Sequence, residues 1–330
     1  MAHTFRAAAL AALTVLGLSL AACSSGSPSG GTEDTAGTGS GDLTPVTVGL
    51  LSIAPSAAIQ YGIDEGIFEA HGLDVTVQIG QGGAALLPAV STGSIQFAVG
   101  NPLSVLVAAD KGLDMRIIAG FSNSKATGDD INAVVALTSS GIASFSDLAG
   151  KTVSVNAVNT QGDLTIKAAA AAEGVDPSSI AFTEIGFADA LAQLERGNVD
   201  AVWIPEPFLS QAVADASLTV VGYSNQAAIP GLPTMVTFTS GAYAEAEPEV
   251  VDAFRDAVGE SLAAASEDSE GFRTTIASFT GMDAAVAADL RFDDLSGEID
   301  ETVLQQLADL AVEYGFLENE PDLGTVILTQ

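Results

Sequence analysis

Two side chains near the end of a short apolar segment have the chemistry of a ligand site. Trp203 is the only tryptophan in the sequence. Glu206 follows it, between Pro205 and Pro207. Proline fixes φ and cannot donate to a strand ladder, so the chain must turn just beyond a strand that we predict over residues 201–204. A flat aromatic face beside a carboxylate suits stacking and polar anchoring of a small molecule. The alternative is a core tryptophan next to a solvated glutamate in a proline turn.

The elements that must position these residues alternate between strands and helices in two blocks. Apolar runs predict strands, and apolar residues at a spacing of four, such as Ile59 and Ile63, predict helices. In the first block we predict strands at residues 46–53, 74–79, 95–99 and 115–121, with helices between them. In the second we predict strands at residues 133–137, 152–155, 180–185, 201–204 and 218–221, with helices over 163–173, 188–196 and 208–214.

A strand at residues 235–239 returns the chain to the first block, and the segments after it are mainly helical. We predict these helices over residues 248–265, 271–279, 283–290 and 299–314. The whole pattern predicts an α/β fold with two mostly parallel sheets. We assign residues 44–132 together with 235–330 to a first lobe and residues 133–234 to a second. The chain then crosses between lobes near residues 132–136 and 231–235, and the cleft between them is the expected ligand site.

The beginning of the chain predicts export and lipidation. Residues 1–6 carry one basic side chain, and residues 7–20 form an apolar run that is too short to span a membrane comfortably, so residues 1–22 are predicted to be a signal peptide. The run ends in Leu-Ala-Ala-Cys at Cys23, the only cysteine, and resembles a bacterial lipobox. The alternative is an ordinary cleavage site with an incidental cysteine. Residues 23–43 are polar and predict a flexible tether with a typical reach of about 25 Å.

The composition excludes several classes of function. The sequence has 10 Lys and Arg against 42 Asp and Glu, which gives a formal net charge of −32, so binding of nucleic acid is not expected. A single cysteine excludes an internal disulfide and a cysteine-based metal site. His3 would be removed with the signal peptide, which leaves His71 in a predicted helix end. A histidine-dependent catalytic triad or metal site is therefore hard to assemble, and we expect no metal and no cofactor.

Five short segments, in order, resemble a known family. They lie at residues 66–75, 93–98, 147–153, 190–201 and 206–208. Together they resemble the solute-binding proteins of ABC importers for sulfonates, nitrate and pyrimidine precursors, over roughly residues 46–265. The resemblance implies a two-lobed periplasmic-binding-protein-like fold of type II, with a hinge and an interlobe cleft. It also implies a permease and ATPase complex as the partner.

In that family, loops at the carboxyl ends of the strands hold the ligand. Carried over to this sequence, the implied ligand-binding residues are Ser52, Pro55, Ser56, Gln81, Gly82, Gly83, Asn101, Pro102, Asn156, Asn159, Gln161, Gly162, Asp163, Trp203 and Glu206. Asn101 and Asp163 are predicted at helix starts, where unpaired N–H groups are available. The alternative for each position is a cap or turn residue without a ligand contact.

The charges in these loops bear on the chemistry of the solute. The loops contain no Lys or Arg, and the nearest is Lys125. The carboxylates of Asp163 and Glu206 would oppose an anion, since like charges at 4 Å repel by several kcal/mol, roughly, at low effective dielectric. We therefore expect a neutral or cationic nitrogen heterocycle, such as a pyrimidine precursor. A sulfonate or nitrate held by helix N-termini remains an alternative.

We expect an extracytoplasmic, monomeric binding protein that is anchored to the membrane through Cys23 and has no catalytic residues. The mechanism is closure of the hinge around a small-molecule solute, followed by delivery to the permease. One alternative is an enzyme of vitamin metabolism with the same fold, in which Asp163 and Glu206 act as paired carboxylates. Another is a surface receptor that reports ligand occupancy to a membrane sensor.

Overall fold

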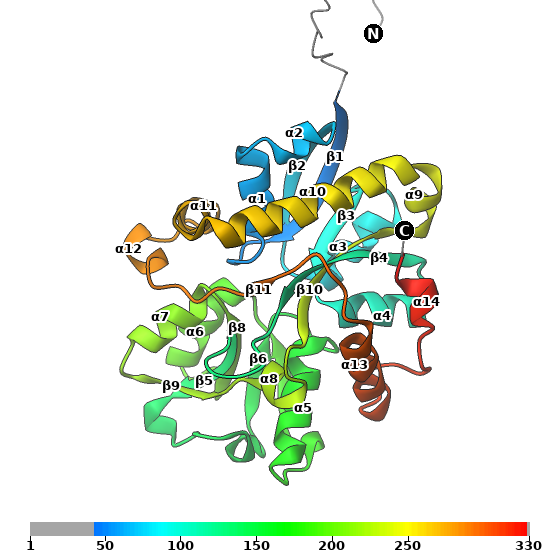
Figure 1. Ribbon diagram of the computed structural model, residues 1–330. Helices are drawn as coiled ribbons and strands as arrows, with labels where there is room; N and C mark the ends of the chain where they lie inside the picture. Colours follow the sequence, from blue (N-terminus) through cyan, green and yellow to red (C-terminus); the bar gives the residue numbers. More distant parts are fainter. Residues whose placement is uncertain (1–42, 329–330) are drawn as a thin grey trace, which may run out of the picture. The chain divides into compact units, whose positions relative to one another are not determined.

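Two mixed β-sheets organise the computed structural model, which describes residues 43–328 (Figure 1). The residues from Gly41 onward form one unit. The predicted signal peptide, the lipidation site at Cys23 and the tether up to residue 42 lie outside the described residues. Among the residues described, no helix is both long enough and apolar enough to cross a bilayer.

The first sheet has the strand order β11-β4-β10-β3-β1-β2. Its strands are β1 (Thr44–Leu51), β2 (Leu73–Gly80), β3 (Phe97–Gly100), β4 (Met115–Asn123), β10 (Pro233–Ser240) and β11 (Asp294–Leu295). β1 is parallel to both β2 and β3, while β10 is antiparallel to β3 and β4. Strand β1 is an apolar run, as expected of a buried parallel strand, and its Val48 and Leu50 are fully buried in the core.

The second sheet has the strand order β7-β6-β8-β5-β9. Its strands are β5 (Asn132–Leu137), β6 (Thr152–Val155), β7 (Ala181–Glu184), β8 (Ala201–Pro205) and β9 (Leu218–Gly222). β6 is parallel to β7 and β8, and β5 is antiparallel to β8 and β9. Apolar clusters lie on both faces of this sheet, as its alternating buried residues require.

The second sheet contains one reversed strand, β5, and the first contains two, β10 between β3 and β4 and the short β11 at the edge beside β4. β5 follows β4 and β10 follows β9, so these two strands are each the first one after the chain has passed from one sheet to the other. The predicted α/β fold with two sheets is confirmed. Most strands in each sheet run in one direction, and the reversed strands make both sheets mixed.

Helices cover the outer faces of both sheets. Around the first sheet lie α1 (Ala57–Asp64), α2 (Ile67–Ala70), α3 (Gly83–Ser91), α4 (Pro102–Asp110), α9 (Gly241–Ala246), α10 (Pro248–Glu267), α11 (Ser269–Thr280), α12 (Ala284–Ala287), α13 (Glu301–Glu313) and α14 (Leu323–Val326). The longest, α10, runs along the first sheet (Figure 1). Its Phe254 ring stacks on Phe97 of β3, with centroids 3.9 Å apart, which fixes the helix on the core.

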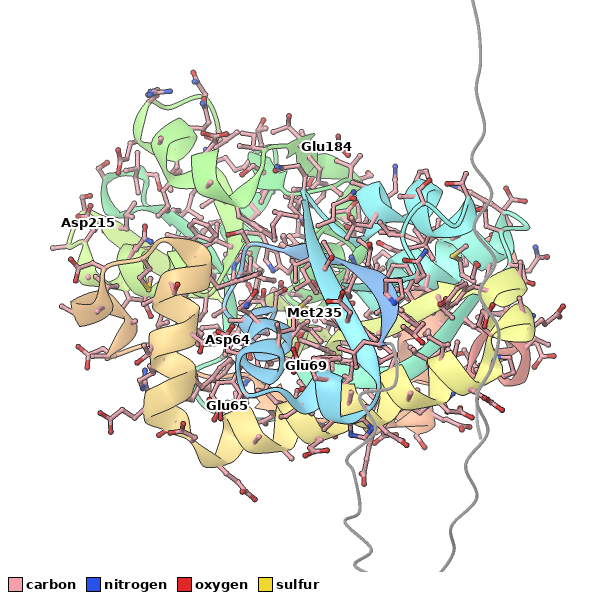
Figure 2. The ribbon with its side chains drawn as sticks, turned by 90° about the horizontal axis from the view of Figure 1, so that it is seen from above. Asp64, Glu65, Glu69, Glu184, Asp215 and Met235 are labelled. Atoms are coloured by element: carbon pink, nitrogen blue, oxygen red, sulfur yellow. The ribbon has the colours of Figure 1, made fainter. Side chains whose placement is uncertain are left out.

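The second sheet carries a smaller set of helices. They are α5 (Gln161–Ala172), α6 (Phe187–Glu195), α7 (Phe208–Ala214) and α8 (Ser224–Ala228), with short 3-10 helices at Thr138–Ser140, Phe145–Leu148 and Pro177–Ser179. Acidic side chains lie over the surface of both parts: Figure 2 labels Asp64, Glu65 and Glu69 near α1 and α2, and Glu184 and Asp215 around the second sheet.

Several local predictions are confirmed and others need correction. Asn101 caps α4 as predicted, because its Oδ1 accepts from the Ser104 N–H at 2.8 Å, and Pro102 occupies the first turn. The helix predicted to start at Asp163 instead begins at Gln161. The mainly helical tail contains the short strand β11, and α8 was not predicted at all. Pro205 belongs to β8, where it pairs with Asn132 at the end of the ladder.

Candidate functional site

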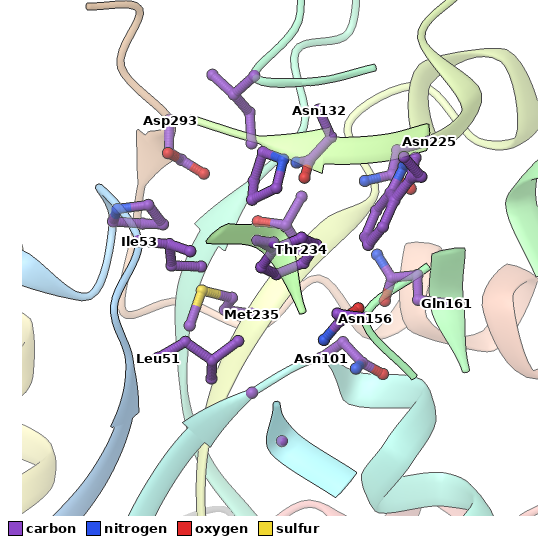
Figure 3. Close-up of a pocket in the computed structure, with 17 residues that line it drawn as sticks. Leu51, Ile53, Asn101, Asn132, Asn156, Gln161, Asn225, Thr234, Met235 and Asp293 are labelled. Atoms are coloured by element: carbon purple, nitrogen blue, oxygen red, sulfur yellow. The ribbon is translucent and has the colours of Figure 1, made fainter. Parts of the chain in front are cut away.

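A buried cavity lies where strand ends of the two sheets meet (Figure 3). From the first sheet and its loops it is lined by Leu51, Ile53, Pro55, Gly83, Gly100 and Asn101. From the second sheet and its helices it is lined by Asn156, Gln161, Phe187, Trp203, Pro205 and Asn225. Its remaining walls are Ile131, Asn132, Thr234 and Met235 at the starts of the reversed strands, and Asp293 from the tail.

The position of the cavity follows from the topology. β1 ends at Leu51, β3 at Gly100 and β8 at Pro205, and all three residues line the cavity. Carboxyl ends of parallel strands are where open α/β sheets bind ligands. The cavity volume is about 40 Å³, several times the roughly 10–15 Å³ that one water needs. The site therefore has room for a small, compact solute.

Trp203 forms one wall of the cavity. Its side chain is held against Phe187 of α6, with ring centroids 5.9 Å apart at an angle of 53°. Behind it, the first turn of α5 approaches so closely that a Cβ on Gly162 would lie 2.8 Å from Cε3 of the indole. Trp203 is 8% exposed, and its Nε1 has no hydrogen-bond partner among the described residues. A buried N–H donor without a partner carries a cost that a solute can remove.

Two amide side chains present further free groups. Gln161 Nε2 donates to the carbonyl oxygen of Pro233 at 2.9 Å, while its Oε1 has no partner in residues 43–328. Asn225 Oδ1 accepts from Thr165 Oγ1 at 3.1 Å, while its Nδ2 is equally without a partner there. Both side chains are 1% exposed. The cavity thus combines a free acceptor from Gln161 with free donors from Asn225 and Trp203.

Asp293 is the one carboxyl group on the described lining. It is 8% exposed, and its Oδ1 has no hydrogen-bond partner within the part of the chain that the structure describes. Burial, together with the neighbouring charges of Asp130 and Glu206, raises the pKa of Asp293 to about 8. At neutral pH this side chain is therefore mainly a neutral carboxylic acid. It can donate a hydrogen bond as well as accept one.

Polar contacts join the loops of the two sheets around the cavity. Asn156 Nδ2 donates to the carbonyl oxygen of Gln81 at 3.4 Å, in addition to the bond from Gln161 to Pro233. On the side of the first sheet, glycines allow the backbone to lie close to neighbouring residues of the cavity. A Cβ on Gly82 would lie 2.8 Å from Asn156 Nδ2, and one on Gly83 would lie 2.9 Å from Cα of Gly100.

A comparison with models of protein families identifies the family of this chain. The model described as NMT1/THI5 like matches residues 55–271, which is more than half of the sequence. The chain belongs to the NMT1/THI5-like family. A search of curated proteins finds no match.

Solved structures share the fold of this NMT1/THI5-like chain. The alkanesulfonate-binding protein SsuA from Xanthomonas axonopodis pv. citri, bound to MOPS, has a TM-score of 0.74 and 19% identity, covering 88% of this chain and 99% of that one. The periplasmic nitrate-binding protein NrtA from Synechocystis PCC 6803 has a TM-score of 0.73 and 15% identity, with coverages of 87% and 86%. The Candida albicans CA3427 gene product has a TM-score of 0.69 and 16% identity, with coverages of 87% and 96%. These likenesses establish the periplasmic-binding-protein fold.

The structure brings together part of the set of residues predicted for this NMT1/THI5-like chain. On the cavity lining lie Pro55, Gly83, Asn101, Asn156, Gln161 and Trp203. The others lie off it: Ser52, Ser56, Gln81, Gly82, Pro102, Asn159, Gly162, Asp163 and Glu206. Among the residues off the lining, Gln81, Gly82 and Gly162 support lining residues through the contacts given above. For all of the predicted residues, contact with a ligand stays a prediction.

The two carboxylates that were expected to face the solute have structural partners instead. Asp163 accepts from the backbone N–H groups of Asn159 and Thr160, both at 2.9 Å, and completes a capping box at the start of α5. Glu206 accepts from Ser210 N at 3.0 Å and Ser210 Oγ at 2.9 Å at the start of α7. Burial raises the pKa of each group against these bonds. Of these carboxyl groups, Asp293 lies on the cavity lining, whereas Asp163 and Glu206 lie off it and their contacts with a ligand stay predictions.

Several residues that line the cavity were not predicted from the sequence. Among them are Phe187, Asn225, Asn132, Thr234, Met235 and Asp293. Asn132 and Thr234 had a usable signal, because they fall within the two predicted crossings between the lobes, which border the expected cleft. Asn225 lies on the unpredicted α8. Asp293 lies in the tail, far from any predicted strand end, and the sequence around it gives no local motif.

Proposed function

We propose that this chain is the solute-binding protein of an ABC importer and that its solute is a neutral or cationic nitrogen heterocycle, such as a pyrimidine precursor. The observation that carries the proposal is a set of buried groups on residues of the cavity lining that have no hydrogen-bond partner among residues 43–328: Trp203 Nε1, Asn225 Nδ2, Gln161 Oε1 and Asp293 Oδ1. Donors and acceptors on residues that line a small cavity, together with an aromatic wall, suit a flat heterocycle with ring nitrogens and polar substituents.

The charge around the cavity supports this choice over an anion. None of the described lining residues is Lys or Arg. The nearby cations already have partners, since Lys125 pairs with Asp294 and Arg291 with Asp129 at 3.0 Å. Sulfonate and nitrate are bound by the solved relatives SsuA and NrtA, according to their descriptions. For this chain they are the alternative, with helix N-termini as the anion donors.

The mechanism that we infer is closure of the two lobes around the solute. The bond from Asn156 to Gln81 joins loops of the two lobes, so it forms only when the lobes are together. The bond from Gln161 reaches Pro233, which lies at the crossing between the lobes. A solute that bridges the same surfaces shifts the population toward this closed state by its differential affinity. The closed form would then be presented to the permease. We also propose an extracytoplasmic location, a lipid anchor on Cys23 and a monomeric, non-enzymatic protein.

Isothermal titration calorimetry with four probes tests the proposal: 4-aminopyrimidine, pyrimidine, methanesulfonate and nitrate. We expect the aminopyrimidine to bind and the two anions not to bind. Trp203→Phe keeps an aromatic face but removes Nε1, so it should weaken binding by about threefold to tenfold, consistent with one hydrogen bond. Trp203→Ala should weaken it further. Preferential binding of an anion, or full affinity in Trp203→Ala, would overturn the proposal, and turnover of any bound probe would favour the enzyme alternative.

A further inference from the structure

The segment of the tail around Asp293 is attached to both parts of the structure. Arg291 donates to Tyr223 Oη at 3.1 Å and pairs with Asp129, and Arg273 lies over the neighbouring Phe292 ring at 4.2 Å. Two residues later, β11 pairs with β4. Asp293 between these attachments is held in place at the cavity. Figure 3 shows it on the side opposite to Asn225 and Gln161.

We propose that Asp293 carries a proton on Oδ1 and donates it to an uncharged ring nitrogen of the solute, so that this residue determines which heterocycles bind. The inference rests on the proposed function and makes the solute class more specific. Its geometric basis is the fixed position of Asp293, its burial and the absence of a partner for Oδ1 within residues 43–328. A solute that fits between Trp203 and Asp293 places a ring edge against this oxygen.

The charges that face Asp293 keep the proton on it. Asp130 precedes β5 and Glu206 follows β8, and both repel a second negative charge at this position. Arg291, on the same segment, is engaged by Asp129, and Lys125 is engaged by Asp294. Desolvation adds to the repulsion, which is the physical origin of the pKa of about 8. No ordinary exposed aspartate would hold a proton at pH 7.

The bond has a distinct dependence on pH. The complex contains one proton between Oδ1 and the ring nitrogen, and the free ligand is uncharged between pH 7 and 10 if it is 4-aminopyrimidine. Below a pH of about 8, the free protein already holds this proton, so the affinity is nearly constant. Above a pH of about 8, the free protein has lost this proton and must take one up when it binds the solute. The affinity then falls by up to about tenfold for each pH unit.

Calorimetric titrations with 4-aminopyrimidine between pH 7 and 10 test whether Asp293 donates this hydrogen bond. They compare three variants with the unmodified protein. Asp293→Asn places an N–H₂ donor where the acid O–H was, so it should keep the affinity at pH 7 within about threefold and lose the decline above pH 8. Asp293→Leu has no donor and should bind at least tenfold more weakly. Asp289→Asn changes an exposed carboxylate of the same tail, away from the pairs that surround Asp293, and should match the unmodified protein throughout.

The outcomes separate the inference from the function on which it rests. If the unmodified protein binds 4-aminopyrimidine but Asp293→Asn shows the same decline with pH, or binds as weakly as Asp293→Leu, the role of Asp293 is wrong and the proposed function stands. If the unmodified protein binds methanesulfonate or nitrate and none of the heterocycles, both are wrong. Circular dichroism of each variant at pH 7 confirms that any loss of binding occurs in folded protein.

Discussion

Gly162 lies so close to Trp203 that no larger residue fits between helix α5 and the indole. The added Cβ of an alanine would be 2.8 Å from Cε3 and 3.1 Å from Cζ3 of the ring. The aromatic wall of the cavity is therefore positioned from behind by a backbone, and from the side by Phe187. Since Trp203 is the only tryptophan in the sequence, its fluorescence reports directly on this contact.

Gly162→Ala should displace the indole, destabilise the protein by about 1–3 kcal/mol through overpacking and weaken solute binding. Urea unfolding, the emission maximum of Trp203 and a calorimetric titration measure these effects. Gly259→Ala is the matched control, because a Cβ there meets no atom within 4 Å and the position is in the interior of α10. It should stabilise the protein by about 0.5–1 kcal/mol and leave affinity unchanged. Equal effects of the two substitutions would contradict the proposed support of Trp203.

Asp163→Ala should reduce stability without a direct effect on the solute. The substitution leaves the buried N–H of Thr160 without its acceptor, at a cost of about 1–3 kcal/mol. Asp147→Ala removes a similar capping-box acid that is exposed at the start of Phe145–Leu148, and should cost about 1 kcal/mol. Thermal unfolding compares the two variants. A loss of affinity of more than tenfold in folded Asp163→Ala would restore this residue to the ligand site.

Glu206→Gln should leave the affinity for 4-aminopyrimidine at pH 7 within about threefold, because the Glu206 carboxylate bonds to Ser210 and does not line the cavity. A glutamine can still accept one of these two bonds, so the loss of stability from hydrogen bonding is about 1 kcal/mol. Removing this negative charge should also lower the pKa of Asp293, since Glu206 is one of the charges that raise it. The affinity of Glu206→Gln should therefore decrease more between pH 7 and pH 9 than the affinity of the unmodified protein does. A calorimetric pH series measures this difference.

The stability of the free protein should decrease as pH rises from about 4 to 8. The pKa of Asp293 is raised to about 8 in the folded protein, so between the unfolded value of 3.8 and this value the folded state holds a proton that the unfolded state has lost. Folding is then favoured at the low end of this range, and the advantage is lost by pH 8. The buried Asp130 and Glu206 have raised pKa values and contribute with the same sign.

Urea unfolding at pH 5, 7 and 9 isolates the part that Asp293 contributes. Asp293→Asn cannot titrate, so its stability should decline less with pH, by a difference on the order of a few kcal/mol between pH 5 and 9. Asp289→Asn serves as the control for a change of net charge at an exposed position. Parallel profiles of Asp293→Asn and the unmodified protein would show that the buried acid is ionised at neutral pH.

Much of the fold could be predicted from the sequence because it depends on local signals. The apolar run of β1 and the Asn-Pro start of α4 each follow from a few adjacent residues, and both are confirmed. The direction of β5 and β10 could not be predicted from the strands themselves, since it depends on where the chain comes from. The family relationship was predicted from short segments whose order is preserved, and the family match confirms it.

The candidate site was harder to predict, because its walls come from segments that are distant in the sequence. Trp203 was predicted from a strand end, which follows a rule of topology, and Gln161 from the resemblance to the family. Glu206 was predicted as a ligand residue because it follows β8, but the sequence does not show that Ser210 binds its carboxylate. Asp293 reaches the cavity only because the tail passes both Tyr223 and β4, a relationship that exists in three dimensions and has no signature in the local sequence.

The attachment of the tail has a consequence for how solute preference diverges between related proteins. The region that matches the family ends at residue 271, before Asp293. A substitution at Asp293 would therefore leave the matched region unchanged. If Asp293 has the proposed role, such a substitution alters the solute preference of this chain while the sequence by which the family is recognised stays the same.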